Sequence, residues 1–92
     1  MLKVNEYFNG NVKSISFQTE DSPATVGVIS SGKYEFDTTK KEILTITSGS
    51  LKVQLPESDW KVFTSGESFT IEAGKIFHVN AEKEVSYICR YY

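Results

Sequence analysis

Apolar and polar residues alternate along short segments of this chain, and this period of two restricts its fold more than any other feature. In Ile15-Ser16-Phe17, Val53-Gln54-Leu55 and Phe69-Thr70-Ile71, every second side chain falls on the same face of an extended backbone. No window of a dozen residues shows the i, i+3, i+4, i+7 apolar spacing of an amphipathic helix. The pattern therefore predicts β-strands and almost no helix.

Turn-forming residues separate these segments at short, regular intervals. Asn9-Gly10 predicts an early turn, and Ser48-Gly49-Ser50, between apolar runs at 43–47 and 51–55, indicates a hairpin. Roughly nine or ten short strands joined by such turns are typical of a β-sandwich or β-barrel. The chain contains no linker or internal repeat, so we predict one domain spanning residues 1–92.

Composition excludes several classes of protein. Of the 92 residues, 39% are hydrophobic, which is too many for a disordered chain. Ten basic against twelve acidic side chains leave a net charge of −2, so we expect no nucleic-acid partner, because phosphate-backbone binding needs a basic face. The longest apolar run, Tyr87-Ile88-Cys89, is too short for a membrane helix or signal peptide, so we expect no membrane association. A single cysteine cannot form an internal disulfide, which favours a cytoplasmic location.

Metal and thiol chemistry have few candidate residues. One histidine and one cysteine exclude a four-ligand Cys/His zinc site within the chain, and Glu42 with His78 alone would make a poor metal site. The alternative interpretation of His78 is a partly exposed strand residue. Cys89 lies in the terminal apolar segment, where a small buried hydrophobe is the expected role.

Arg90 is the only arginine, and it lies in a strand-like segment flanked by aromatic residues. A planar guanidinium suits bidentate binding of phosphate or carboxylate, and it is costly among apolar groups without a partner. An anion-binding role is one interpretation. The other is a structural pair with an acidic residue, for instance at a dimer contact. Alternation places Tyr87, Cys89 and Tyr91 on one face of this strand and Arg90 on the opposite face.

A second candidate region extends from Tyr34 to Glu42. Tyr34 and Phe36 share one face of a predicted strand, and Thr38 and Glu42 follow as the chain enters the next strand. Aromatic walls with a hydroxyl and a carboxylate would suit a polar ring ligand. The alternative is a core aromatic pair beside a solvated glutamate.

Two spacings resemble the motifs of cupins. Glu42 and Gly49 are separated by six residues, as in the second half of the first cupin motif, and Gly66 precedes Glu72-Ala73-Gly74 as in the second. Further segments resemble the short, single-domain pyrimidine/purine nucleoside phosphorylase family. These are Asn5-Glu6-Tyr7-Phe8, Val12-Lys13-Ser14-Ile15, Gly32-Lys33-Tyr34-Glu35-Phe36, Leu44-Thr45-Ile46-Thr47-Ser48-Gly49, Asp59-Trp60 and Ser86-Tyr87-Ile88-Cys89-Arg90-Tyr91. The resemblance implies an RmlC-like jelly roll, a cupin-type β-barrel.

The sequence departs from the cupin metal motif. Phe36 and Thr38 stand where metal-binding cupins carry a His-x-His pair, and Phe77 occupies the histidine position of the second motif. His78 comes one residue late, and a shift of one places a side chain on the opposite face of a strand. We therefore transfer no metal, and we expect no cofactor.

The resemblance implies phosphorolysis of purine and pyrimidine nucleosides, with inorganic phosphate as co-substrate and free base and pentose 1-phosphate as products. Arg90 and Lys13 are the candidate phosphate ligands. Glu42 is the candidate for stabilising the cationic sugar, and His78 is the candidate for protonating the leaving base if it faces inward. The candidate substrate-binding residues are Tyr34, Phe36, Thr38 and Phe77.

Two other functions stay open at this point. A non-catalytic cupin that binds a sugar or nucleoside would explain the degenerate metal positions, and a metal-dependent cupin isomerase or oxygenase is opposed by the single histidine. We also expect a homodimer, because small barrels with exposed aromatic residues tend to pair with two-fold symmetry.

Overall fold

The computed structural model describes residues 1–92 and consists of ten β-strands without a helix, as the period-two pattern predicts. It therefore has no helix long and apolar enough to cross a membrane. In chain order the strands are β1 (Lys3–Tyr7), β2 (Val12–Gln18), β3 (Pro23–Ile29), β4 (Gly32–Asp37), β5 (Glu42–Ser48), β6 (Ser50–Gln54), β7 (Trp60–Thr64), β8 (Ser68–Ile71), β9 (Ile76–Ala81) and β10 (Val85–Tyr91).

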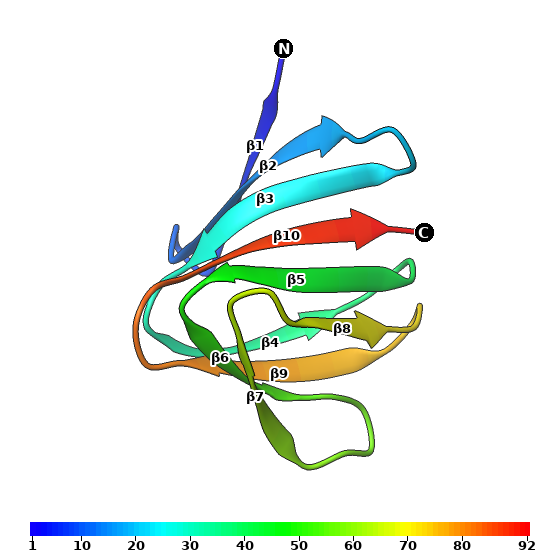
Figure 1. The fold of residues 1–92 in the computed structure, drawn as a ribbon. Coiled ribbons are helices and arrows are strands. Elements are labelled where there is room, and N and C mark those ends of the chain that lie inside the picture. Colours follow the sequence, from blue (N-terminus) through cyan, green and yellow to red (C-terminus); the bar gives the residue numbers. More distant parts are fainter.

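The strands form two sheets that face each other (Figure 1). The six-stranded sheet has the order β1-β2-β3-β10-β5-β8, the four-stranded sheet has the order β4-β9-β6-β7, and all neighbours are antiparallel. The all-β architecture is confirmed. No ladder joins the sheets, so the molecule is an open sandwich and does not close into a barrel.

The core lies between the inner faces of the two sheets. Ile46 from β5 and Leu51 and Val53 from β6 are completely buried, and Phe77 and Val79 of β9 lie beside them. Their polar neighbours along each strand point outward, as the alternation predicts. Fully burying an aliphatic side chain of this size stabilises a fold by about 1.5–3 kcal/mol.

The hairpin predicted at Ser48-Gly49-Ser50 is wrong. The chain does turn there, but β5 pairs with β10 and β8 while β6 pairs with β9 and β7, so the turn carries the chain from one sheet to the other. Gly49 has a φ of 90°, and a Cβ there would lie 3.0 Å from the Glu84 carbonyl oxygen. Turn residues between two apolar segments occur both in a hairpin and in a connection from one sheet to the other. In a hairpin β6 would pair with β5, but here β10 takes that place beside β5.

The turn predicted at Asn9-Gly10 is confirmed. Asn9 (φ 57°) and Gly10 (φ 84°) form its centre, and the Asn11 amide closes it by donating to the Phe8 carbonyl oxygen at 3.2 Å. A second turn overlaps it: the Gly10 amide donates to the Tyr7 carbonyl oxygen at 3.2 Å around Phe8 (φ 54°) and Asn9. The register of β1 on β2, in which Tyr7 pairs with Val12, leaves residues 8–11 for this connection.

Candidate active site

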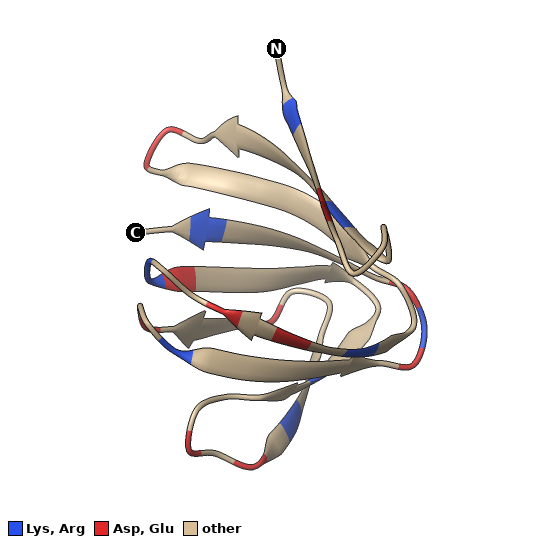
Figure 2. Cartoon of the chain, turned by 180° about the vertical axis from the view of Figure 1, so that it is seen from behind, with Lys and Arg blue, Asp and Glu red and all other residues tan.

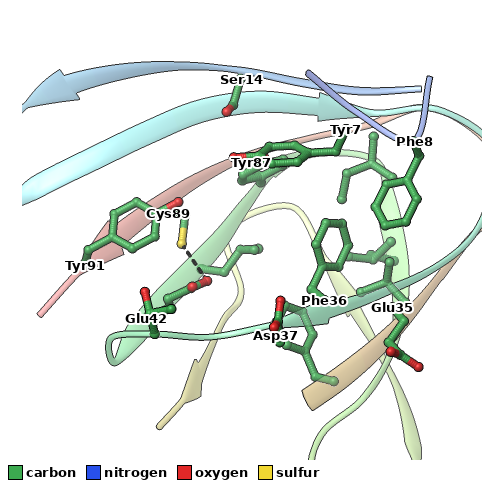
Figure 3. A pocket seen from close by; sticks show the side chains of 16 residues that line it. Tyr7, Phe8, Ser14, Glu35, Phe36, Asp37, Glu42, Tyr87, Cys89 and Tyr91 are labelled. Atoms are coloured by element: carbon green, nitrogen blue, oxygen red, sulfur yellow. Dashed lines mark hydrogen bonds between the residues drawn. The ribbon is translucent and has the colours of Figure 1, made fainter. Parts of the chain in front are cut away.

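A pocket of about 450 Å³ lies between the two sheets, where β1 and β2 lie over β4 (Figure 3). Sixteen residues line it, and eleven of them are hydrophobic. They come from both sheets and from the turn after β1: Tyr7, Phe8, Ser14, Ile29, Glu35, Phe36, Asp37, Thr39, Glu42, Leu44, Leu51, Phe77, Val79, Tyr87, Cys89 and Tyr91. None of these side chains contains nitrogen, so the pocket is lined without a cation.

One wall of the pocket is a layer of phenyl rings. Phe36 on β4 and Phe77 on β9 are cross-strand partners, and their rings stack with centroids 5.5 Å apart and 24° between planes. Phe8 meets Phe36 edge-on at 5.5 Å. Such rings offer an apolar surface against which a flat ligand can stack.

The opposite wall comes from alternate residues of β10. Tyr87, Cys89 and Tyr91 point into the pocket, as their alternation predicts (Figure 3). Burial raises the pKa of Tyr87 to about 12, so its hydroxyl stays protonated and can donate a hydrogen bond. Tyr87 fits because β3 has a glycine opposite it: a Cβ at Gly27 would lie 2.6 Å from the Tyr87 hydroxyl oxygen.

Glu42 is a half-buried carboxyl group at the polar end of the pocket. Burial raises the pKa of Glu42, and the hydrogen bond from the Cys89 thiol, with Sγ 3.4 Å from Oε1, partly offsets this effect. Burial together with the nearby carboxylate raises the pKa of Cys89, so the thiol is a hydrogen-bond donor here and a poor nucleophile. Tyr91 lies beside them, and its hydroxyl is 3.0 Å from Thr25 Oγ1.

Comparison with known proteins assigns the family. The model of the family described as pyrimidine/purine nucleoside phosphorylase matches residues 2–91. A pyrimidine/purine nucleoside phosphorylase of Cellvibrio japonicus is 58% identical over 92 residues, covering 99% of each chain, and one from Alcanivorax borkumensis is 52% identical over 99% of this chain and 98% of the relative. The chain belongs to the pyrimidine/purine nucleoside phosphorylase family. The resemblance seen in the sequence is thus confirmed.

Comparison with solved structures identifies the fold. A protein of unknown function from Vibrio parahaemolyticus is 36% identical and superposes with a TM-score of 0.94 over 100% of this chain and 99% of that one. An RmlC-like cupin from Shewanella frigidimarina, at 16% identity, has a TM-score of 0.77 over 98% of this chain and 82% of that one. The predicted cupin-type fold is therefore confirmed.

The pocket of this family member contains three of the residues selected from sequence, namely Glu42, Phe36 and Phe77. Tyr34 and Thr38 are buried but do not line it. The Tyr34 hydroxyl donates to the carbonyl oxygens of Ser30 (3.0 Å) and Ser31 (3.2 Å), so it secures the turn before β4.

Thr38 has a comparable structural role behind the pocket. Its hydroxyl donates to the Glu72 carbonyl oxygen at 2.7 Å, and the Lys75 amide donates to Thr38 Oγ1 at 3.0 Å. Thr38 therefore ties the β8–β9 turn to the end of β4. Thr39, the next residue, is the one that lines the pocket.

The three candidate nitrogen-bearing residues lie outside the pocket. His78 is on the outer face of β9, where its Nε2 lies 3.1 Å from Glu35 Oε1. Lys13 is exposed and pairs with Glu6 at 3.4 Å, while its neighbour Ser14 points inward. Arg90 is half-buried between the inward-facing Cys89 and Tyr91. Strand alternation is the physical reason for all three positions.

The residues at the cupin metal positions do not fit a metal ion. Phe36 and Phe77 present phenyl rings to the pocket where imidazoles would be needed, and Thr38 uses its hydroxyl on backbone groups. No three His, Cys, Asp or Glu side chains are grouped closely enough to hold a metal ion. Of the four cupin metal positions, only that of Glu42 carries a side chain that commonly ligates a metal ion.

Several lining residues were not selected from sequence. Tyr7, Phe8 and Ser14 come from the β1–β2 hairpin, whose position over β4 no local pattern reveals. Tyr87 and Cys89 could have been selected as pocket residues, because strand alternation places them on the face of β10 opposite Arg90. The structure shows that their face, and not that of Arg90, lines the pocket.

The raised pKa of Glu42 predicts a pH-dependent stability. A carboxyl group whose pKa is higher in the folded state favours folding at low pH, and this contribution is lost as the pH rises from the ordinary pKa of 4.5 through the folded pKa. In Glu42→Gln the contribution is absent at every pH. We therefore expect the stability of the wild type, relative to Glu42→Gln, to fall as the pH rises above 4.5. Urea unfolding of both proteins at several pH values measures it, and a difference that rises with pH would contradict the assigned cause.

Proposed function

We propose that this chain is a nucleoside phosphorylase of broad specificity, which converts purine and pyrimidine nucleosides and phosphate into free base and pentose 1-phosphate. The observation that carries the proposal, beside family membership, is a pocket with phenyl rings on one wall and a half-buried carboxyl at one end. A volume of about 450 Å³ lies in the range of small-molecule sites. Stacking on rings suits any nucleobase, because each has a π-face.

In the proposed reaction the bond between the sugar anomeric carbon and the base nitrogen breaks, and the base leaves with the bonding electrons. A phosphate oxygen forms the new bond to the same carbon, and the proton that hydrogen phosphate releases ends on the departing base. The sugar passes through an oxocarbenium-like state, which the carboxylate of Glu42 would stabilise while it orients the sugar hydroxyls. Phe36 and Phe77 would hold the base.

Phosphate is the only co-substrate that we propose, without a metal or cofactor. Since no lysine, arginine or histidine lines the pocket, phosphate would be held there by neutral donors, and the hydroxyl groups of Ser14, Tyr87 and Tyr91 are the candidates. A cytoplasmic location is part of the same proposal, supported by a single cysteine that forms no disulfide.

The decisive experiment incubates purified protein with uridine or adenosine, with and without phosphate, and separates the released bases by chromatography. We expect base release only with phosphate, together with equimolar pentose 1-phosphate. No phosphate-dependent release from any common nucleoside would refute the proposed reaction.

A second candidate function is nucleoside or sugar binding without turnover. The lack of a cation among the lining residues favours it, since an anionic co-substrate usually meets a charged partner. This function predicts a nucleoside-dependent rise in the melting temperature with no base released, which the same samples would show in a thermal-shift assay.

We propose a homodimer that pairs through the outer face of the six-stranded sheet. Val4, Ile15, Val26 and Ile88 lie side by side across β1, β2, β3 and β10 on this face, and Val28 extends the row. Val26 and Val28 are nearly half exposed, and Figure 2 shows that β3 carries no charged residue. A second copy would cover these side chains with the same apolar face, as a two-fold axis requires.

Arg90 supplies a test of this interface. It lies on the same face of β10 as Ile88 and forms no ion pair within the chain, so we expect Arg90→Ala to weaken the dimer about tenfold. The KM for phosphate should change less than about twofold, because Arg90 points away from the pocket lining. Sedimentation velocity and phosphate titration measure both, with the exposed Lys83→Ala as control. A raised phosphate KM in an intact dimer would instead support the phosphate-binding interpretation of Arg90.

A further inference from the structure

Phe8 occupies a backbone conformation that its side chain disfavours. It is the first central residue of the Tyr7–Gly10 turn, with a φ of 54°, and Asn9 follows with a φ of 57°. Gly10 continues the left-handed run with a φ of 84°, and such turn positions strongly favour asparagine, aspartate and glycine. A bulky aromatic residue with positive φ is an outlier that persists only where other interactions hold it, and such outliers concentrate at functional sites.

The ring of Phe8 bridges the two sheets at the pocket. Its centroid lies 4.9 Å from that of Tyr34 and 5.5 Å from that of Phe36, both on β4, although Phe8 itself follows β1 of the other sheet. Phe8 lines the pocket, and Figure 3 shows its ring above that of Phe36. Phe8 is still 43% exposed, so its packing within the free protein is incomplete.

We propose that Phe8 is a substrate-contact residue that stacks on the nucleobase and so controls nucleoside affinity. This inference rests on the proposed function. The strained turn places a half-exposed ring on the same aromatic layer as Phe36 and Phe77, where an entering base can cover it. Tyr34, by contrast, is 9% exposed and uses its hydroxyl on backbone carbonyls, so it supports the layer from behind.

The test replaces Phe8 by asparagine, a residue that tolerates a left-handed φ. The variant Phe8→Asn removes the ring and relieves the backbone strain, so we expect it to fold. We expect the KM for both uridine and adenosine to rise about tenfold, with the KM for phosphate and kcat changed less than about threefold. Phe8→Tyr, which keeps the ring, should stay near the wild type, whereas Phe8→Leu should resemble Phe8→Asn.

Trp60→Ala is the matched control, because Trp60 is 46% exposed and lies outside the pocket. It should leave every kinetic constant unchanged. If Phe8→Asn and Phe8→Leu both fold and keep the wild-type nucleoside KM, the inference is overturned. It is overturned as well if Phe8→Asn fails to fold but Phe8→Leu folds with wild-type kinetic constants.

Measurements on the wild-type protein distinguish failure of the proposed reaction from failure of this inference. Absence of phosphate-dependent base release by the wild type would refute the reaction alone. The contact made by Phe8 would then be tested by titrating uridine and adenosine in the thermal-shift assay, where Phe8→Asn should weaken binding about tenfold. Equal binding by the wild type and Phe8→Asn would overturn the inference in that case too.

Discussion

Replacing Glu42 by glutamine should lower kcat for phosphorolysis at least a hundredfold while the protein remains folded. Glutamine keeps the size and hydrogen-bonding capacity of the side chain but removes the negative charge that would stabilise the cationic sugar. Removing one electrostatic group from an active site typically costs about 10²–10³ in rate. Phosphate-dependent base release measures kcat, and nucleoside-induced thermal shifts show whether binding survives.

Glu35→Gln is the matched control for this substitution. Glu35 also borders the pocket, but its carboxylate is exposed and pairs with His78, and Figure 3 shows it directed away from the Glu42 end. We expect its rate to stay within about threefold of the wild type. A Glu42→Gln enzyme with nearly normal kcat would remove Glu42 from the mechanism and leave Asp37 as the next carboxyl group of the pocket lining to test.

Substituting Gly27 by alanine should damage both the fold and the pocket. The added Cβ would lie 2.6 Å from the Tyr87 hydroxyl oxygen and 2.7 Å from the Lys13 carbonyl oxygen, and the second of these atoms belongs to the backbone of the neighbouring strand. Overpacking of this kind costs about 1–3 kcal/mol, and the Tyr87 ring must move within the pocket to relieve it. Urea unfolding gives the loss of stability, and the nucleoside KM reports the displaced ring.

Two further variants isolate the cause. Gly27→Ala combined with Tyr87→Phe removes one of the three close contacts and leaves those with Lys13 O (2.7 Å) and Tyr87 Cζ (2.8 Å), so it should recover only part of the stability. Gly66→Ala is the control for a glycine in open space: nothing lies within 4 Å of its added Cβ, although its φ of 91° disfavours alanine. We expect Gly66→Ala to lose stability without a change in the nucleoside KM. Wild-type stability in Gly27→Ala would show that β2 and β3 can separate more easily than their register implies.

Local pattern was sufficient to predict the elements of this fold but not all of their partners. The alternation that places Leu51 and Val53 inside, and the glycine at 49 that reverses the chain, are both properties of a few neighbouring residues. Whether the chain then pairs with itself or crosses to the second sheet depends on β10, which comes more than thirty residues later and takes the place beside β5. Turn signals carry no information about such long-range competition.

The candidate site shows the same division. Glu42, Phe36 and Phe77 were found from a resemblance and from strand alternation, and the outward position of His78 agrees with its one-residue offset but not with the acid role that requires it to face inward. Tyr7 and Phe8 were not found, because they belong to a hairpin at the start of the chain whose contact with β4 depends on the packing of the two sheets. The roles of these residues in catalysis and binding stay predictions.

The sequence by itself determined that the chain is an antiparallel β-protein of the cupin type, which side chains share a face of each strand, and to which family it belongs. These properties depend on side-chain period, turn residues and ordered motifs, which are local. Only the tertiary structure decided that the sandwich stays open, that Phe8 reaches across it, and that no cation lines the pocket. Those features depend on which faces meet in space, because the free energy of packing is shared among residues far apart in the chain.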